Sequence, residues 1–117
     1  MTVLSRYINN FSNQTILVIG DIIADEFIVG KPERLSREAP VLILRHQEKN
    51  ITPGGGANAA NNVCSLGGKV KLSGIIGNDQ SGKILKNVLN EKGIDTEGLI
   101  IDNQRPTSLK TRIQAGG

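Results

Sequence analysis

Three short apolar runs, rich in β-branched residues, alternate along the chain with two stretches of helical periodicity. The runs cover residues 15–19, 69–77 and 99–101, and the amphipathic stretches cover residues 56–66 and 81–92. A continuous apolar run is typical of a buried parallel strand, whereas apolar residues at i, i+3 and i+4 are typical of a helix. The order strand, helix, strand, helix, strand predicts an α/β fold, an open and mostly parallel sheet flanked by helices.

A long insertion, residues 21–55, separates the first strand from its helix. Two apolar segments within it, 26–29 and 41–44, predict strands, with a polar loop between them at residues 31–34. Insertions at the carboxyl end of a strand lie where open α/β proteins bind ligands. We therefore expect a β-flap over about residues 26–52 that covers a pocket or pairs with another subunit.

Other features of the sequence argue against several classes of protein. Residues 1–11 have helical spacing and predict a short helix laid on the body, without a signal peptide. No apolar run reaches the roughly 20 residues of a membrane helix. Aromatic residues make up only 3% of the chain, and the net charge of +3 comes from scattered cations, so nucleic acid is not expected as a partner. The single cysteine, Cys64, suits a reducing cytoplasm and reads as a core residue.

A glycine-rich turn precedes the first helix. Gly54, Gly55 and Gly56 would let the backbone approach a ligand closely, and Asn58 in the first helical turn could bind hydroxyl groups. A tight turn with a capping asparagine explains the same residues, and the glycines alone favour that interpretation.

Two aspartates follow the first strand. Asp21 and Asp25 lie at the expected ligand edge of the sheet, and one carboxylate can accept two adjacent O–H donors of a sugar. Solvated turn aspartates account for them equally well. Only Gly20 of a dinucleotide-binding glycine pattern is present, which disfavours that fold.

Two further segments carry cations. Residues 77–84 nearly complete a phosphate-loop motif with Lys83, but Ile84 stands where a hydroxyl residue should hold magnesium, and Asp79 adds negative charge. Lys110 and Arg112 would share one face of a strand and could receive a phosphate, although a solvated strand face is the simpler interpretation. His46 has no evident partner, and no Cys/His cluster suggests a metal site.

Taken together, these segments resemble the ribokinase-like (pfkB-type) carbohydrate kinases. The stretch 54–60 followed by Gly67 and Gly77 resembles the first signature of that family, and residues 20–25 resemble its strand-end sugar motif. The closest likeness, carried by residues 20–25, 35–41 and 105–112, is to the D-glycero-β-D-manno-heptose 7-phosphate kinases of ADP-heptose synthesis, which can be fused to a nucleotidyltransferase domain. The resemblance implies a lid and dimer clasp in the flap.

The same resemblance assigns roles to single residues. It implies that Asp25, Gly54, Gly55 and Asn58 contact the sugar, with Asp21, Lys110 and Arg112 as further substrate contacts. The second signature of the family, with the catalytic base, the anion hole and most of the nucleotide site, has no counterpart in residues 1–117. ATP and Mg²⁺ are therefore expected only in the full-length enzyme, and no catalytic residue is assigned here.

We expect the chain to be the amino-terminal, sugar-binding part of an ATP-dependent sugar or sugar-phosphate kinase, inactive by itself, cytoplasmic and homodimeric through the flap. One alternative is a stand-alone module that binds a sugar without turnover or serves dimerisation. Another is a phosphate-loop nucleotide hydrolase built on residues 77–83.

Overall fold

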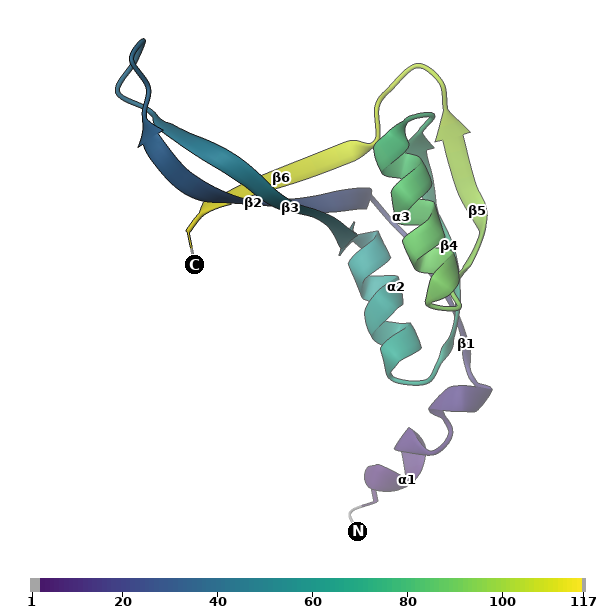
Figure 1. The fold of residues 1–117 in the computed structure, drawn as a ribbon. Helices are drawn as coiled ribbons and strands as arrows, with labels where there is room; N and C mark the ends of the chain where they lie inside the picture. The colour runs from purple at the N-terminus through teal and green to yellow at the C-terminus, as the bar shows by residue number, and fades with distance from the viewer. Residues whose placement is uncertain (1–2, 117) are drawn as a thin grey trace.

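The computed structural model describes residues 3–116 and has the α/β architecture that the sequence predicts (Figure 1). A short 3₁₀ helix, Phe11–Asn13, follows the first α-helix. The elements in chain order are α1 Ser5–Ile8, β1 Thr15–Ile19, β2 Ile22–Leu35, β3 Leu42–Gly55, α2 Gly56–Ser65, β4 Lys69–Gly77, α3 Gln80–Glu91, β5 Asp95–Asp102 and β6 Ser108–Ala115.

The body is a parallel three-stranded sheet in the order β1-β4-β5, covered by α2 and α3. The chain steps across this sheet in one direction, so crossovers of one hand place both helices on the same face. The core lies between that face and the helices, where Leu72, Leu85 and Leu89 have at most 1% of their surface exposed. In the first half of β4, exposed polar residues alternate with buried apolar ones, as expected when helices cover one face of the sheet.

The opposite face of the body sheet is open, and this corrects the expectation of fully buried strands. Leu17 and Ile19 of β1 are 58% and 73% exposed, and Ile100 of β5 is 62% exposed. A five-residue apolar run predicts a strand but does not show what covers each face. Residues 3–116 supply helices for one face only.

The flap is longer than the sequence suggests. β2 and β3 form an antiparallel hairpin of 14 residues each, and β6 returns from the body to pair in parallel with β2, giving the order β3-β2-β6. The prediction of a polar loop at residues 31–34 is wrong. These residues belong to β2, and the loop that connects β2 to β3 is at residues 36–41. The flap projects from the body (Figure 1), and the radius of gyration is 18.4 Å, against about 13 Å for a compact domain of roughly 100 residues.

The amino-terminal helix is shorter than expected and does not lie on the body. α1 has four residues, and Leu4, Tyr7 and Ile8 are at least 60% exposed. Figure 1 shows this segment pointing away from α2 and α3. Residues 1 and 2 of the expected helix lie outside the described part. None of the helices in residues 3–116 is long and apolar enough to cross a membrane.

Candidate functional site

One face of the flap gathers three of the residues predicted from the sequence. Asp25 pairs in register with Thr52 of β3 and Lys110 of β6, and Phe27 pairs with Arg112. Residues paired across neighbouring strands project from the same side of a sheet. We call this side, with Asp25, Phe27, Thr52, Lys110 and Arg112, the front face of the flap.

Asp25 is held against the glycine turn. A Cβ atom on Gly54 would lie 2.9 Å from Asp25 Oδ2 and 3.2 Å from the carbonyl oxygen of Ile23. The absence of a side chain at Gly54 therefore makes room for the carboxylate. Asp25 Oδ1 is buried without a hydrogen-bond partner among the described residues. Because an unsatisfied buried carboxylate oxygen costs free energy, this atom is suited to accept a ligand hydroxyl.

The glycine turn also contacts the segment that leaves β1. The N–H of Gly56 donates to the carbonyl oxygen of Asp21 at 2.7 Å, and a Cβ on Gly55 would lie 2.6 Å from the same oxygen. Gly55 has a φ of 56°, a left-handed conformation that favours glycine. Asp21 itself is exposed at the carboxyl end of β1. The turn thus brings α2, β1 and the flap together at one edge of the body sheet.

A hollow of about 330 Å³ lies at this edge, and we call it the sheet-edge hollow. Four isoleucines, Ile19, Ile22, Ile75 and Ile100, form its apolar part, and one carboxylate, one guanidinium, two hydroxyls and the backbone of two glycines form the rest. Its polar and glycine lining is Gly20, Asp21, Ser73, Gly74, Arg105 and Ser108. Ser108 pairs with Ile23, two residues along β2 from Asp25, so the hollow adjoins the front face of the flap.

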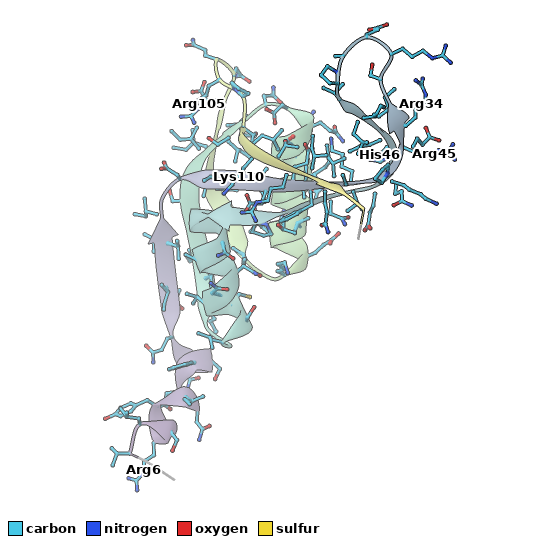
Figure 2. All side chains as sticks on the ribbon, turned by 90° about the vertical axis from the view of Figure 1, so that its left-hand side faces the viewer. Arg6, Arg34, Arg45, His46, Arg105 and Lys110 are labelled. Atoms are coloured by element: carbon cyan, nitrogen blue, oxygen red, sulfur yellow. The ribbon has the colours of Figure 1, made fainter. Side chains whose placement is uncertain are left out.

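The structure separates the other predicted residues from the hollow. Asn58 is exposed on the first turn of α2 and is not part of the hollow's lining. Arg112 lies over the ring of Phe27, with 5.3 Å between Cζ and the ring centroid. Lys110 lies on β6 between the hollow and Arg112, whereas His46, Arg34 and Arg45 lie together in the outer flap (Figure 2). Exposure of His46 agrees with its interpretation as a surface residue.

Sequence reasoning did not assign a role from the residues to Arg105, Ser108 or Glu26. Arg105 lines the hollow and donates from Nη2 to Ser108 Oγ at 3.3 Å. Its place between two strand-forming segments was a usable signal, because the end of β5 reaches the same sheet edge as the end of β1. Glu26 gave no signal, since strand alternation alone does not show which acidic side chain is buried.

The segment that resembles a phosphate loop is closed by its own aspartate. Asp79 Oδ1 accepts the N–H of Gly82 at 2.8 Å and the hydroxyl of Thr107 at 2.7 Å, and Oδ2 accepts the N–H of Thr107 at 2.7 Å. These bonds hold the pKa of Asp79 below its ordinary value, Gly82 contributing most. The start of α3 therefore presents a carboxylate where a phosphate would need free N–H groups.

A bound metal ion requires several ligand side chains placed close together. Within residues 3–116 no group of three or more His, Cys, Asp or Glu side chains is placed to hold a metal ion. The hydrogen bonds of Asp79 at the start of α3 argue against a nucleotide phosphate bound at residues 77–84.

Comparison with known proteins decides the family. The family model described as "pfkB family carbohydrate kinase" matches residues 13–117. The chain belongs to this family. Among curated relatives, the chain is 53% identical over 100 residues to the "Bifunctional protein HldE" of Helicobacter pylori (strain P12), and 40% identical over 103 residues to that of Desulfatibacillum aliphaticivorans. These matches cover 86% and 88% of the chain but only 22% and 21% of the relatives.

Solved structures of sugar kinases share the fold of this pfkB-family chain. A carbohydrate kinase from Agrobacterium tumefaciens matches with a TM-score of 0.68 and 26% identity over 87% of the chain and 32% of its own length. A fructokinase from Xylella fastidiosa with bound ATP matches with a TM-score of 0.61 and 27% identity, covering 86% of the chain and 29% of that protein. The fold is therefore ribokinase-like, and the 117 residues represent part of it.

Proposed function

We propose that this chain is the part of an ATP-dependent carbohydrate kinase that binds the acceptor sugar. The observation that carries the proposal is the buried, unpaired Oδ1 of Asp25, which lies against Gly54 on the front face of the flap, next to the hollow that Asp21 lines. Carboxylate oxygens, hydroxyls and glycine backbone suit a ligand with several hydroxyl groups. Membership of the pfkB family makes a sugar the expected ligand.

We further propose a sugar phosphate, with heptose 7-phosphate as the expected acceptor and ADP-heptose synthesis as the context. Support comes from the identity of about 50% to HldE proteins, from Arg105 in the lining of the hollow, and from Lys110 and Arg112 on the adjoining front face of the flap. ATP would be the donor, as the bound ATP of the fructokinase neighbour suggests for this family. The catalytic base and the nucleotide site would lie in the larger part of the relatives that this chain does not match.

The flap supports a second function in the same reaction. The hairpin and β6 carry Asp25 and Lys110 on one face, so movement of the flap toward the body would enclose an acceptor in the hollow. We propose that it serves as a lid. A homodimer through the flap and a cytoplasmic location stay predictions, the first checked by light scattering and the second by fractionation of the source cells.

The experiment is steady-state kinetics of the full-length protein with ATP and heptose 7-phosphate, comparing the natural protein with Asp25→Ala and Asp25→Asn. We expect both substitutions to raise the KM for the sugar phosphate at least roughly tenfold while the KM for ATP stays unchanged, since a lost charged hydrogen bond costs about 1.5–3 kcal/mol. Arg34→Gln, in the outer flap, is the control. Natural KM and kcat in both Asp25 variants would remove Asp25 from the site, and sugar binding without turnover would favour a binding module.

A further inference from the structure

A single buried carboxylate links all three strands of the flap from the side opposite the front face. Glu26 of β2 is 4% exposed. Its Oε2 accepts the hydroxyl of Thr111 of β6 at 2.8 Å, and its Oε1 lies 2.6 Å from Nζ of Lys49 of β3. The Lys49 ammonium, and then the Thr111 hydroxyl, hold the pKa of Glu26 below its ordinary value. We call Glu26, Lys49 and Thr111 the back-face cluster.

The back-face cluster lies directly behind the residues assigned to substrate binding. Glu26 stands between Asp25 and Phe27 in β2, and Thr111 stands between Lys110 and Arg112 in β6. Glu26 pairs with Thr111 in register, as Asp25 pairs with Lys110. The contact between Glu26 and Thr111 therefore fixes the same register that places Lys110 beside Asp25.

Stability alone gives a weak reason for a charge at this position. A buried charged side chain and the partner groups it binds can be replaced by apolar residues of similar size with little loss, and at times with a gain, of stability. The neighbours of Glu26 on the same face of β2, Ile22 and Ala24, are buried and apolar. An apolar side chain at residue 26 would continue that pattern and would still cover the back face.

Register is the property that apolar packing specifies poorly here. β6 starts next to Thr107, which is hydrogen-bonded to Asp79 on the body, and within the flap β2 is the one strand of residues 3–116 with which it pairs. A slip of two residues would keep every side chain of β6 on its own face and would still move Lys110 away from Asp25. A directional hydrogen bond between Glu26 and Thr111 penalises that slip, because it would leave the carboxylate without its donor.

We propose that Glu26, through Thr111 and Lys49, is a positioning residue that sets β6 in the register in which Lys110 and Arg112 face the acceptor bound at Asp25. This inference rests on the proposed function, since it concerns the geometry of the same acceptor site. Glu26 itself faces away from the front face and does not contact the acceptor.

The test uses the full-length protein with the substitutions Thr111→Val and Glu26→Met/Thr111→Val, which remove the hydrogen bond and keep side-chain volume. Lys49 is 52% exposed, so its ammonium can return to water. We expect Thr111→Val to lower the unfolding midpoint in urea, because it leaves the Glu26 carboxylate without its donor, and the double variant to recover most of that loss. Both variants should raise the KM for the sugar phosphate roughly tenfold and leave the KM for ATP unchanged. A misplacement of about 1 Å can cost up to a factor of about 100.

The matched control is Glu33→Gln, which removes an ion pair with Arg45 farther along β2, where Glu33 is 38% exposed. It should leave both KM values unchanged. A folded Thr111→Val or double variant with the natural sugar KM would overturn the positioning role. If the double variant does not fold, Thr111→Val alone decides, because it changes one hydroxyl to a methyl group.

Failure of this inference differs from failure of the proposed function. If Asp25→Ala raises the sugar KM and the back-face variants do not, Asp25 binds the acceptor and register is fixed without Glu26. If Asp25→Ala has no effect, the acceptor site itself is wrongly placed and the positioning role falls with it.

Discussion

Asp79 and Thr107 join the start of α3 to the start of β6 through two hydrogen bonds of 2.7 Å, one from the backbone N–H and one from the hydroxyl of Thr107. The same hydroxyl oxygen accepts the N–H of Gly77 at 2.9 Å, and Thr107 is 4% exposed. The strand that carries Lys110 and Arg112 is therefore anchored on the body immediately before it enters the flap. Asp79 caps α3 and fixes the origin of β6 with one carboxylate.

Asp79→Ala should destabilise the full-length protein by about 1–2 kcal/mol, because it removes a helix cap, with the bonds to Thr107 adding to the loss. The free energy of unfolding in urea measures the change. Glu91→Ala, an exposed acid at the end of the same helix, should change the value by less than about 0.5 kcal/mol. Equal values for the two variants would contradict the anchoring role.

The contribution of Asp79 to stability should disappear in acid. Its pKa is lowered from the ordinary 3.8, so the charged form is favoured in the folded protein, and the linked stability is fully present above that value. It is lost as the pH falls below about 4 and through the lower folded pKa. The difference in unfolding free energy between the natural protein and Asp79→Asn should therefore be constant near neutral pH and shrink below pH 4. A constant difference down to pH 2 would oppose this assignment.

Lys83→Ala should leave nucleotide binding unchanged in the full-length protein. Asp79 already takes the N–H of Gly82 at the start of α3, so Lys83 does not complete a phosphate-binding loop. Equilibrium binding of a fluorescent ATP analogue to the natural protein and the variant measures this. Loss of binding in Lys83→Ala, with natural binding in Asp25→Ala, would restore the nucleotide hydrolase hypothesis.

The body could be predicted from sequence because its signals are local. The strand at residues 69–77 agrees with β4, and Gly93, with a φ of 83°, ends α3 as the pattern predicts. Burial was predicted less well, since apolar Leu17 and Ile19 carry no information on which face a helix covers. The prediction that the amino-terminal helix lies on the body was wrong for the same reason, because apolar spacing does not show what a helix packs against.

The site needed long-range pairing that local patterns do not contain. Asp25 and Lys110 could each be singled out in the sequence, but only the parallel pairing of β2 with β6 places them together. The buried state of Glu26 depends on Lys49 and Thr111, 23 and 85 residues away. Arg105 reaches the hollow through the loop after β5, whose path was not predicted.

Gly54→Ala should weaken acceptor binding. The added methyl group would lie 2.9 Å from Asp25 Oδ2, which is too close, so the carboxylate must move. We expect a higher sugar KM with little change in the KM for ATP. Gly67→Ala is the control: Gly67 has a φ of 93° with no atom within 4 Å of an added Cβ, so this variant should lose about 1 kcal/mol of stability and keep the natural KM. The opposite ranking of the two KM values would contradict the role of Gly54.

Arg105→Gln should distinguish a phosphorylated acceptor from a neutral one. Arg105 lines the sheet-edge hollow together with Asp21, so a ligand that fills it can place hydroxyls at the carboxylate and an anionic group at the guanidinium. We expect Arg105→Gln to raise the KM for heptose 7-phosphate at least roughly tenfold and to leave that for the unphosphorylated heptose almost unchanged.

Arg105→Lys should fall between the natural protein and Arg105→Gln, because lysine keeps the charge and loses the two-pronged geometry. The kinetics of both sugars with Lys110→Gln, measured in parallel, show which cation meets the phosphate. Equal losses for both sugars in Arg105→Gln would mean that Arg105 shapes the hollow, through its bond to Ser108, rather than binding an anion. If only Lys110→Gln loses the preference for the phosphorylated sugar, we would conclude that the phosphate binds at the front face of the flap.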